Sequence, residues 1–133
     1  MLIASPRPSR WRAERGSTVV ETAILAPVLV FVTFLVFQTA FYYHDRNIVS
    51  SAAQVGVEAA RVEGAGPAAG QQAASSFLAQ AAPNLRGTSV SASSNGSTVT
   101  VVVTANATAL VPLVSPPPVR ITATGPIEAV SSP

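Results

Sequence analysis

The chain has no cysteine and no lysine, and its 133 residues include one histidine and one aspartate. Without cysteine, disulfide frameworks, thiolate nucleophiles and cysteine-ligated metals are excluded. His44 and Asp45 are adjacent, so on a helix their side chains point in different directions and do not form a Ser-His-Asp arrangement. Neither a metal-ligand spacing nor a glycine-rich phosphate loop occurs. The sequence therefore predicts a protein that is not an enzyme and that has no metal or other cofactor.

The basic residues are few and unevenly placed. All eight are arginine, and four lie within the first 15 residues: Arg7, Arg10, Arg12 and Arg15. After residue 44, four arginines are balanced by four acidic residues. A basic cluster beside an otherwise near-neutral region indicates membrane topology and not a nucleic-acid-binding face. The cluster predicts a cytoplasmic N-terminus and an extracytoplasmic C-terminal region, with no nucleic-acid partner.

A long apolar run follows the basic cluster. The 22 residues from Thr22 to Tyr43 carry no charge. As a helix they would extend about 33 Å, which is enough to cross a hydrocarbon core of about 30 Å. Tyr42 and Tyr43 end the run as interfacial aromatics. We interpret residues 17–43 as a transmembrane helix and residues 1–16 as a short, disordered cytoplasmic leader.

A cleaved secretory signal peptide is an alternative for the same run. Signal peptides have an apolar region of about 7–15 residues followed by an A-x-A-like site. This run is longer, and its nearest candidate site, Gln38-Thr39-Ala40, begins with a poor residue and precedes aromatics. The sequence favours a retained membrane helix.

Two residues in this helix require an explanation. Glu21 lies at the start of the apolar run, and a carboxylate costs about 2.5–3.5 kcal/mol at the centre of a membrane helix and less near the interface. Pro27 cannot donate a hydrogen bond to the carbonyl of Ala23, which predicts a kink or local weakening. This proline is either an ordinary membrane proline or a flexible point needed when the helix leaves the bilayer.

The helix is expected to continue beyond the membrane to residue 63. A heptad stripe follows the aromatics, with members Ile48, Ala52, Val55, Ala59 and Val62. Glu58 and Arg61 can form an ion pair at i, i+3. Gly64-Ala65-Gly66-Pro67 then ends the helix, and a second helix is predicted from Pro67 to Ala82.

The remaining residues predict three strands. Val90 and Ala92 alternate with serines in the first, and Asn95-Gly96 predicts a type I′ hairpin turn. Thr98–Ala105 is rich in valine and threonine and predicts the second strand, whose one face carries Val99, Val101, Val103 and Ala105. A proline-rich loop at residues 107–118 precedes a third strand at Val119–Thr124. We predict an α+β fold with a three-stranded antiparallel sheet backed by the long helix, an extracytoplasmic region at residues 44–128 and a flexible tail at 129–133.

The sequence from Arg15 to Leu29, RGSTVVETAILAPVL, resembles the TadE-like family, pseudopilins of the tight-adherence (Tad/Flp) pilus assembly system. The family's Arg-Gly, Val-Glu and Pro positions fall on Arg15-Gly16, Val20-Glu21 and Pro27. The resemblance implies cleavage between Gly16 and Ser17 by a prepilin peptidase. It also implies partners: an assembly platform with its ATPase, and other pilin or pseudopilin subunits.

The resemblance implies a role for Glu21. Cleavage gives Ser17 a free ammonium, and a carboxylate four residues later can pair with it or with a neighbouring subunit's N-terminus. Major Flp pilins are shorter and have tyrosine where this chain has Thr22, which favours a minor subunit. Two other interpretations remain: an uncleaved single-pass anchor presenting a small extracytoplasmic domain, with Glu21 paired to Arg15, and a secreted protein.

Overall fold

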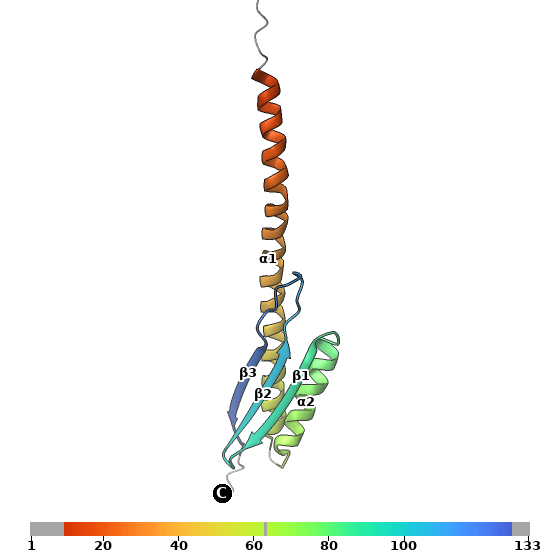
Figure 1. Cartoon of the computed structure of the whole chain (residues 1–133). Helices are drawn as coiled ribbons and strands as arrows, with labels where there is room; N and C mark the ends of the chain where they lie inside the picture. The colour runs from red at the N-terminus through yellow and green to blue at the C-terminus, as the bar shows by residue number, and fades with distance from the viewer. Residues whose placement is uncertain (1–9, 63, 129–133) are drawn as a thin grey trace, which may run out of the picture. The chain divides into compact units, whose positions relative to one another are not determined.

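The computed structural model describes residues 10–62 and 64–128, with side chains described from Arg15 onward. The chain divides after Val36 into two units, and residues from Phe37 onward are called the C-terminal unit. The predicted α+β class is confirmed (Figure 1). The elements, in order, are α1 (Arg10–Ala60), α2 (Gly66–Ala81), β1 (Arg86–Ser94), β2 (Thr98–Asn106) and β3 (Val119–Pro126).

Helix α1 begins earlier and ends slightly earlier than predicted. Residues 10–16 are helical, so the prediction of a disordered leader is wrong there. The helix-breaking prolines precede Arg10, whereas Arg, Ala and Glu, which are strong helix formers, supply most of the segment that follows. Residues 1–9, residue 63 and the predicted tail at 129–133 lie outside the described residues.

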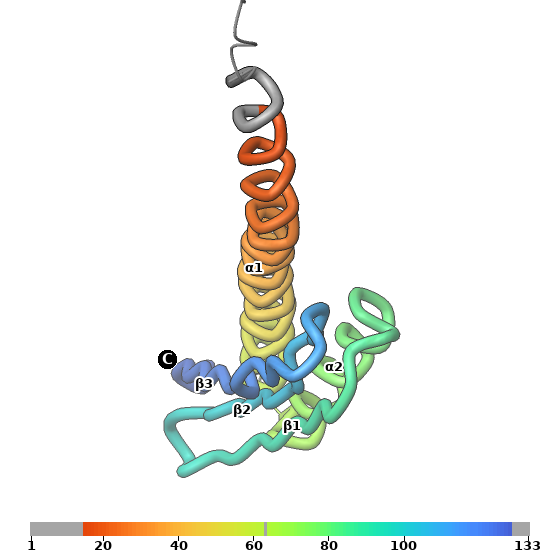
Figure 2. The backbone as a smooth tube through the Cα atoms, turned by 45° about the horizontal axis from the view of Figure 1, so that its top comes forward, coloured from red at the N-terminus to blue at the C-terminus, as the bar shows by residue number. Residues whose placement is uncertain are grey.

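The sheet has the predicted three antiparallel strands in the order β1-β2-β3 (Figure 2). Strand β2 is central, with Ser94 opposite Val99 on one side and Val119 opposite Ala105 on the other. The alternation predicted for β2 is confirmed, because four of its side chains are fully buried on one face: Val99, Val101, Val103 and Ala105. The proline-rich loop joins β2 to β3, as predicted.

The β1–β2 hairpin is confirmed, but its predicted turn type is wrong. Gly96 has φ +95°, whereas Asn95 is not among the described residues with positive φ, so the two-residue type I′ turn is absent. The Asn95 side-chain oxygen instead accepts hydrogen bonds from the backbone N–H groups of Ser97 (3.1 Å) and Thr98 (2.8 Å). An asparagine side chain that binds the following backbone makes an Asx turn, and this turn needs no left-handed asparagine.

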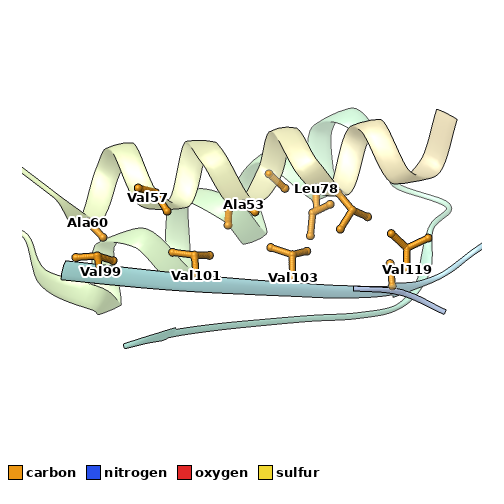
Figure 3. Close-up of a cluster of buried hydrophobic side chains, with 12 residues drawn as sticks. Ala53, Val57, Ala60, Leu78, Val99, Val101, Val103 and Val119 are labelled. Atoms are coloured by element: carbon orange, nitrogen blue, oxygen red, sulfur yellow. The ribbon is translucent and has the colours of Figure 1, made fainter. Parts of the chain in front are cut away.

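The core of the C-terminal unit lies between the last part of α1, helix α2 and the sheet (Figure 3). On α1 its buried residues are Val49, Ala52, Ala53, Val57 and Ala60. The predicted stripe shares only Ala52 with this set, and Val62 is 54% exposed. The prediction is wrong by about one residue of helix rotation, because buried Gly56 turns toward the sheet and an apolar-periodicity pattern does not count glycine.

Helices α1 and α2 approach closely at two glycines that the sequence analysis did not single out. A Cβ added to Gly70 would lie 2.6 Å from the carbonyl oxygen of Gly56 and 2.7 Å from the Cβ of Ala60. A Cβ added to Gly56 would lie 3.0 Å from both the Gly70 oxygen and a Val101 methyl. The absence of both side chains lets two helices and the central strand share one contact point.

Candidate functional site

The predicted processing site is exposed and lies within a helix. Arg15, Gly16 and Ser17 are all exposed on α1, and a Cβ added to Gly16 would meet nothing within 4 Å. The peptide bond between Gly16 and Ser17 is therefore surrounded by helical backbone. A glycine inside a helix lowers helix stability by about 1 kcal/mol relative to alanine, so the helix is weakened at the predicted cleavage position.

Glu21 lies one helical turn after Ser17. Because a helix has 3.6 residues per turn, positions 17 and 21 share one face, whereas Arg15 and Glu21, six positions apart, do not. The ion pairs between described residues join Arg61 to Glu58 (3.1 Å) and to Glu128 (3.3 Å), and none of them includes Glu21. Arg15 and Glu21 therefore do not share a face for the alternative ion pair, and the pairing of Glu21 with Ser17 stays a prediction.

An exposed apolar surface follows Glu21. Within the described residues, α1 is the one helix that is long and apolar enough to cross a membrane, and its most apolar window has no buried residue. This surface is the pattern of a single-pass membrane protein. Its largest exposed side chains up to Phe37 are Ile24, Leu25, Val28, Leu29, Val30, Phe31, Val32, Phe34, Leu35, Val36 and Phe37.

Pro27 lies inside α1, which is helical on both sides of it. A shallow apolar depression begins one residue after Glu21 and does not include the proline; it is lined by Thr22, Leu25, Ala26, Val28, Leu29 and Val32. The hydroxyl of Thr33 donates to the carbonyl oxygen of Leu29 at 2.8 Å, a bond that often bends helices. The kink at Pro27 stays a prediction.

Two polar residues of α1 bind the loop after β2, and the sequence analysis did not predict this contact. Gln38 donates through Nε2 to the carbonyl of Thr108 and accepts at Oε1 from the N–H of Leu110, both at 2.6 Å. The Asp45 carboxylate accepts from the N–H of Thr108 at 2.8 Å. Both side chains are buried, at 7% and 6% exposed. Positions 38 and 45 are two turns apart, so α1 holds the loop at two points on one face.

These contacts change how the end of the apolar run is interpreted. The sequence suggested Gln38 only as part of a cleavage-site candidate, and it suggested Asp45 only as a neighbour of His44 that forms no catalytic arrangement. Both belong to the folded C-terminal unit, which begins at Phe37. The apolar segment free of such contacts, residues 17–37, would extend about 31 Å, which still matches a hydrocarbon core. The sequence offered one sign of this contact, because a glutamine within a long apolar run needs hydrogen-bond partners.

Part of the chain is similar to a known protein family. The family model described as TadE-like protein matches residues 16–58, from the predicted processing site to near the end of α1. No curated protein and no solved structure matches the chain. The resemblance to the TadE-like family is confirmed over this segment, which contains Glu21, Pro27, Gln38 and Asp45.

Proposed function

We propose that this protein is a minor pseudopilin-like subunit for assembly of a Tad/Flp pilus, anchored by α1 with its N-terminus in the cytoplasm. The observation that carries the proposal is that the TadE-like match begins at Gly16, where the predicted processing site lies. Glu21 and the exposed apolar surface follow in the order that pilin-like precursors require. The proposed role is structural, without catalysis by the chain itself.

We propose that a prepilin peptidase cleaves between Gly16 and Ser17. The mature chain would then comprise 117 residues, Ser17 to Pro133, without the four N-terminal arginines. Losing these charges removes the anchor that holds the N-terminus in the cytoplasm. Because α1 begins at Arg10, cleavage also removes helical residues and leaves a new helix end with four unpaired N–H groups.

Glu21 is suited to this new helix end. The ammonium of Ser17 and the unpaired N–H groups both make the mature N-terminus positive, and a carboxylate within the first turns is stabilised there. In a low-dielectric environment, removing one member of a buried charge pair costs about 3–5 kcal/mol. Glu21 would therefore set subunit register, through its own Ser17 or that of a neighbouring subunit.

The apolar surface of α1 supplies the proposed packing face for other subunits. The depression between Thr22 and Val32 accepts the ridge of another helix and begins one residue after Glu21. Helix packing and charge pairing would then occur side by side. The proposed partners are the prepilin peptidase, the assembly platform with its ATPase, other pilin or pseudopilin subunits, and the membrane.

One observation favours a second candidate, an uncleaved single-pass anchor presenting the C-terminal unit outside the cell. The Gly16–Ser17 bond lies within α1, whereas proteases bind their substrates in extended form. Cleavage thus requires the peptidase to unwind this part of the helix. The two candidates differ in one measurable property, the mature N-terminus.

The decisive experiment is to measure the intact mass and N-terminal peptide of the full chain from host membranes, with and without the peptidase. We expect a peptidase-dependent N-terminus at Ser17. A Gly16→Leu variant should stay uncleaved, while the matched Ala13→Leu variant should be processed. A Met1 N-terminus in the presence of active peptidase would leave the uncleaved anchor as the function, and an N-terminus beyond residue 40 would indicate a signal peptide.

The role of Glu21 is tested separately. We expect Glu21→Gln to be cleaved normally but to lose co-isolation with other pilin subunits, because the carboxylate acts after cleavage. The assignment would be wrong if Glu21→Gln blocked cleavage while an uncleavable Gly16→Leu chain still assembled. Peptide mass and cross-linked complexes from the same membranes report both properties.

A further inference from the structure

The loop between β2 and β3 exposes apolar side chains at its tip. Residues 107–118 carry no charge, and Leu113 is 107% exposed with φ +70°. A branched residue rarely adopts this left-handed conformation, and here the conformation directs a large apolar side chain away from the protein. Leu110 and Val114 are 36% and 37% exposed beside it. In water alone, the exposure of these apolar side chains is unfavourable.

This loop is fixed next to the end of the apolar run. Gln38, the residue directly after Phe37, binds Thr108 and Leu110, and Asp45 binds Thr108 again. The loop therefore starts at the level of α1 where the membrane-compatible surface stops. Tyr42 and Tyr43 lie one turn further along α1, with their rings edge to face at 6.1 Å, and tyrosines mark membrane interfaces.

We propose that the exposed apolar side chains at the tip of this loop, Leu110, Leu113 and Val114, insert into the lipid interface of the membrane that α1 crosses. A bilayer interface accepts uncharged apolar side chains without a shaped pocket, and it lies at the depth where Gln38 holds the loop. The hydrogen bonds of Gln38 and Asp45 occupy the backbone groups of Thr108 and Leu110, which lipid could not satisfy.

The loop tip and α1 together give the C-terminal unit two membrane contacts. A single helix lets a domain rotate and change depth, whereas a second contact to one side of the helix fixes both. The inference rests on membrane anchoring by α1, which belongs to the proposed function, and it does not depend on cleavage or on a pilus.

The absence of cysteine allows a direct test with the full chain in vesicles of phosphatidylethanolamine and phosphatidylglycerol. A single nitroxide label is attached at Leu113→Cys, and collisions are measured with oxygen, which concentrates in lipid, and with a water-soluble nickel chelate. Ser97→Cys is the matched control, because Ser97 is an exposed loop residue at the opposite end of β2, about 30 Å away along the strand. Val28→Cys serves as the membrane reference.

We expect the oxygen-to-nickel collision ratio at position 113 to exceed that at 97 severalfold and to approach the ratio at 28. If the collision ratio were lipid-like at position 28 but equally water-like at positions 113 and 97, loop insertion would be wrong while membrane anchoring by α1 would stand. A water-like value at 28 would overturn both the inference and the anchor on which it rests. Ser115→Cys, an exposed neighbour in the same loop, gives the same reading should the Leu113 variant not fold.

Discussion

The two parts of α1 are both apolar, yet they differ in the size of their side chains. Up to Phe37 the helix presents leucine, phenylalanine, valine and isoleucine, and these side chains are exposed. Beyond Asp45 its buried face consists of alanine, glycine and valine, with Val49, Ala52, Ala53, Gly56 and Val57 in contact with the rest of the C-terminal unit. The exposed surface before Phe37 and the buried face after Asp45 therefore differ more in side-chain size than in hydrophobicity.

The difference in side-chain size has a physical reason, which is the distance at which each part of α1 can pack against its neighbours. Large apolar side chains stabilise a helix in lipid or against another subunit because they carry much surface to remove from water. Small residues bury less surface each, but they let the backbones of α1, α2 and β2 approach closely, as at Gly56 and Gly70. The same substitution should therefore change the stability of the isolated chain much more in the second part of the helix than in the first.

The largest effect is expected when the close approach is blocked. Gly70→Val should lower the free energy of unfolding by about 3 kcal/mol, because its Cβ would overlap backbone at Gly56 and a strand-backed helix cannot retreat. Gln72→Val, on the exposed face of α2, is the matched control. Denaturant unfolding of the full chain in detergent measures both, and equal midpoints would contradict the tight contact.

The same substitution in the two parts of α1 tests the comparison directly. Val49→Ala should cost about 2 kcal/mol, because Val49 is fully buried, through lost burial and a residual cavity. Val28→Ala, at a residue 52% exposed, should change stability by less than about 0.5 kcal/mol. Similar losses for both variants in denaturant unfolding would show that the first part of the helix has an internal partner after all.

Removing the loop contact should have a more local effect. Gln38→Ala leaves the Thr108 carbonyl and the Leu110 N–H without their side-chain partner, at a cost of about 1–3 kcal/mol. Amide hydrogen exchange should accelerate at Leu110 and stay slow in β2, with Asn47→Ala as an exposed α1 control. Unchanged exchange at Leu110 would mean that Gln38 does not hold the loop.

The smallest effect is expected at the end of α1. Arg61 pairs with Glu58 and Glu128, whose side chains are 69% and 62% exposed, so Arg61→Ala should cost less than about 1 kcal/mol. A double-mutant cycle with Glu128→Gln isolates one pair by thermal unfolding. A coupling energy between Arg61 and Glu128 above about 1 kcal/mol would mean that this ion pair is a main stabilising contact of the C-terminal unit.

Much of the fold could be predicted because its signals are local. In β2, apolar residues recur at every second position, and this pattern predicts a strand with one buried face whatever packs against it. The prolines of the 107–118 loop exclude a central strand there. The i, i+3 spacing of Glu58 and Arg61 gave a correct ion pair. Each of these predictions needs only the geometry of neighbouring residues.

The features that could not be predicted depend on residues distant in sequence. Gln38 and Thr108 are 70 positions apart, and nothing in the apolar run indicates which loop a glutamine will bind. The buried face of α1 is set by Gly56 meeting Gly70 and Val101, so apolar periodicity alone gave a stripe rotated by one residue. At the predicted processing site, the motif indicated Gly16 but not that the helix extends back to Arg10 and encloses it.

The glycine contact also bears on the order of folding. Gly56 and Gly70 lie only 14 positions apart, so bringing α1 and α2 together closes a short loop at little entropic cost. Strand β2 comes from much later in the chain and completes the core through non-local contacts, which form more slowly. We expect the helix pair to form first as the chain emerges and to act as the surface on which the sheet assembles.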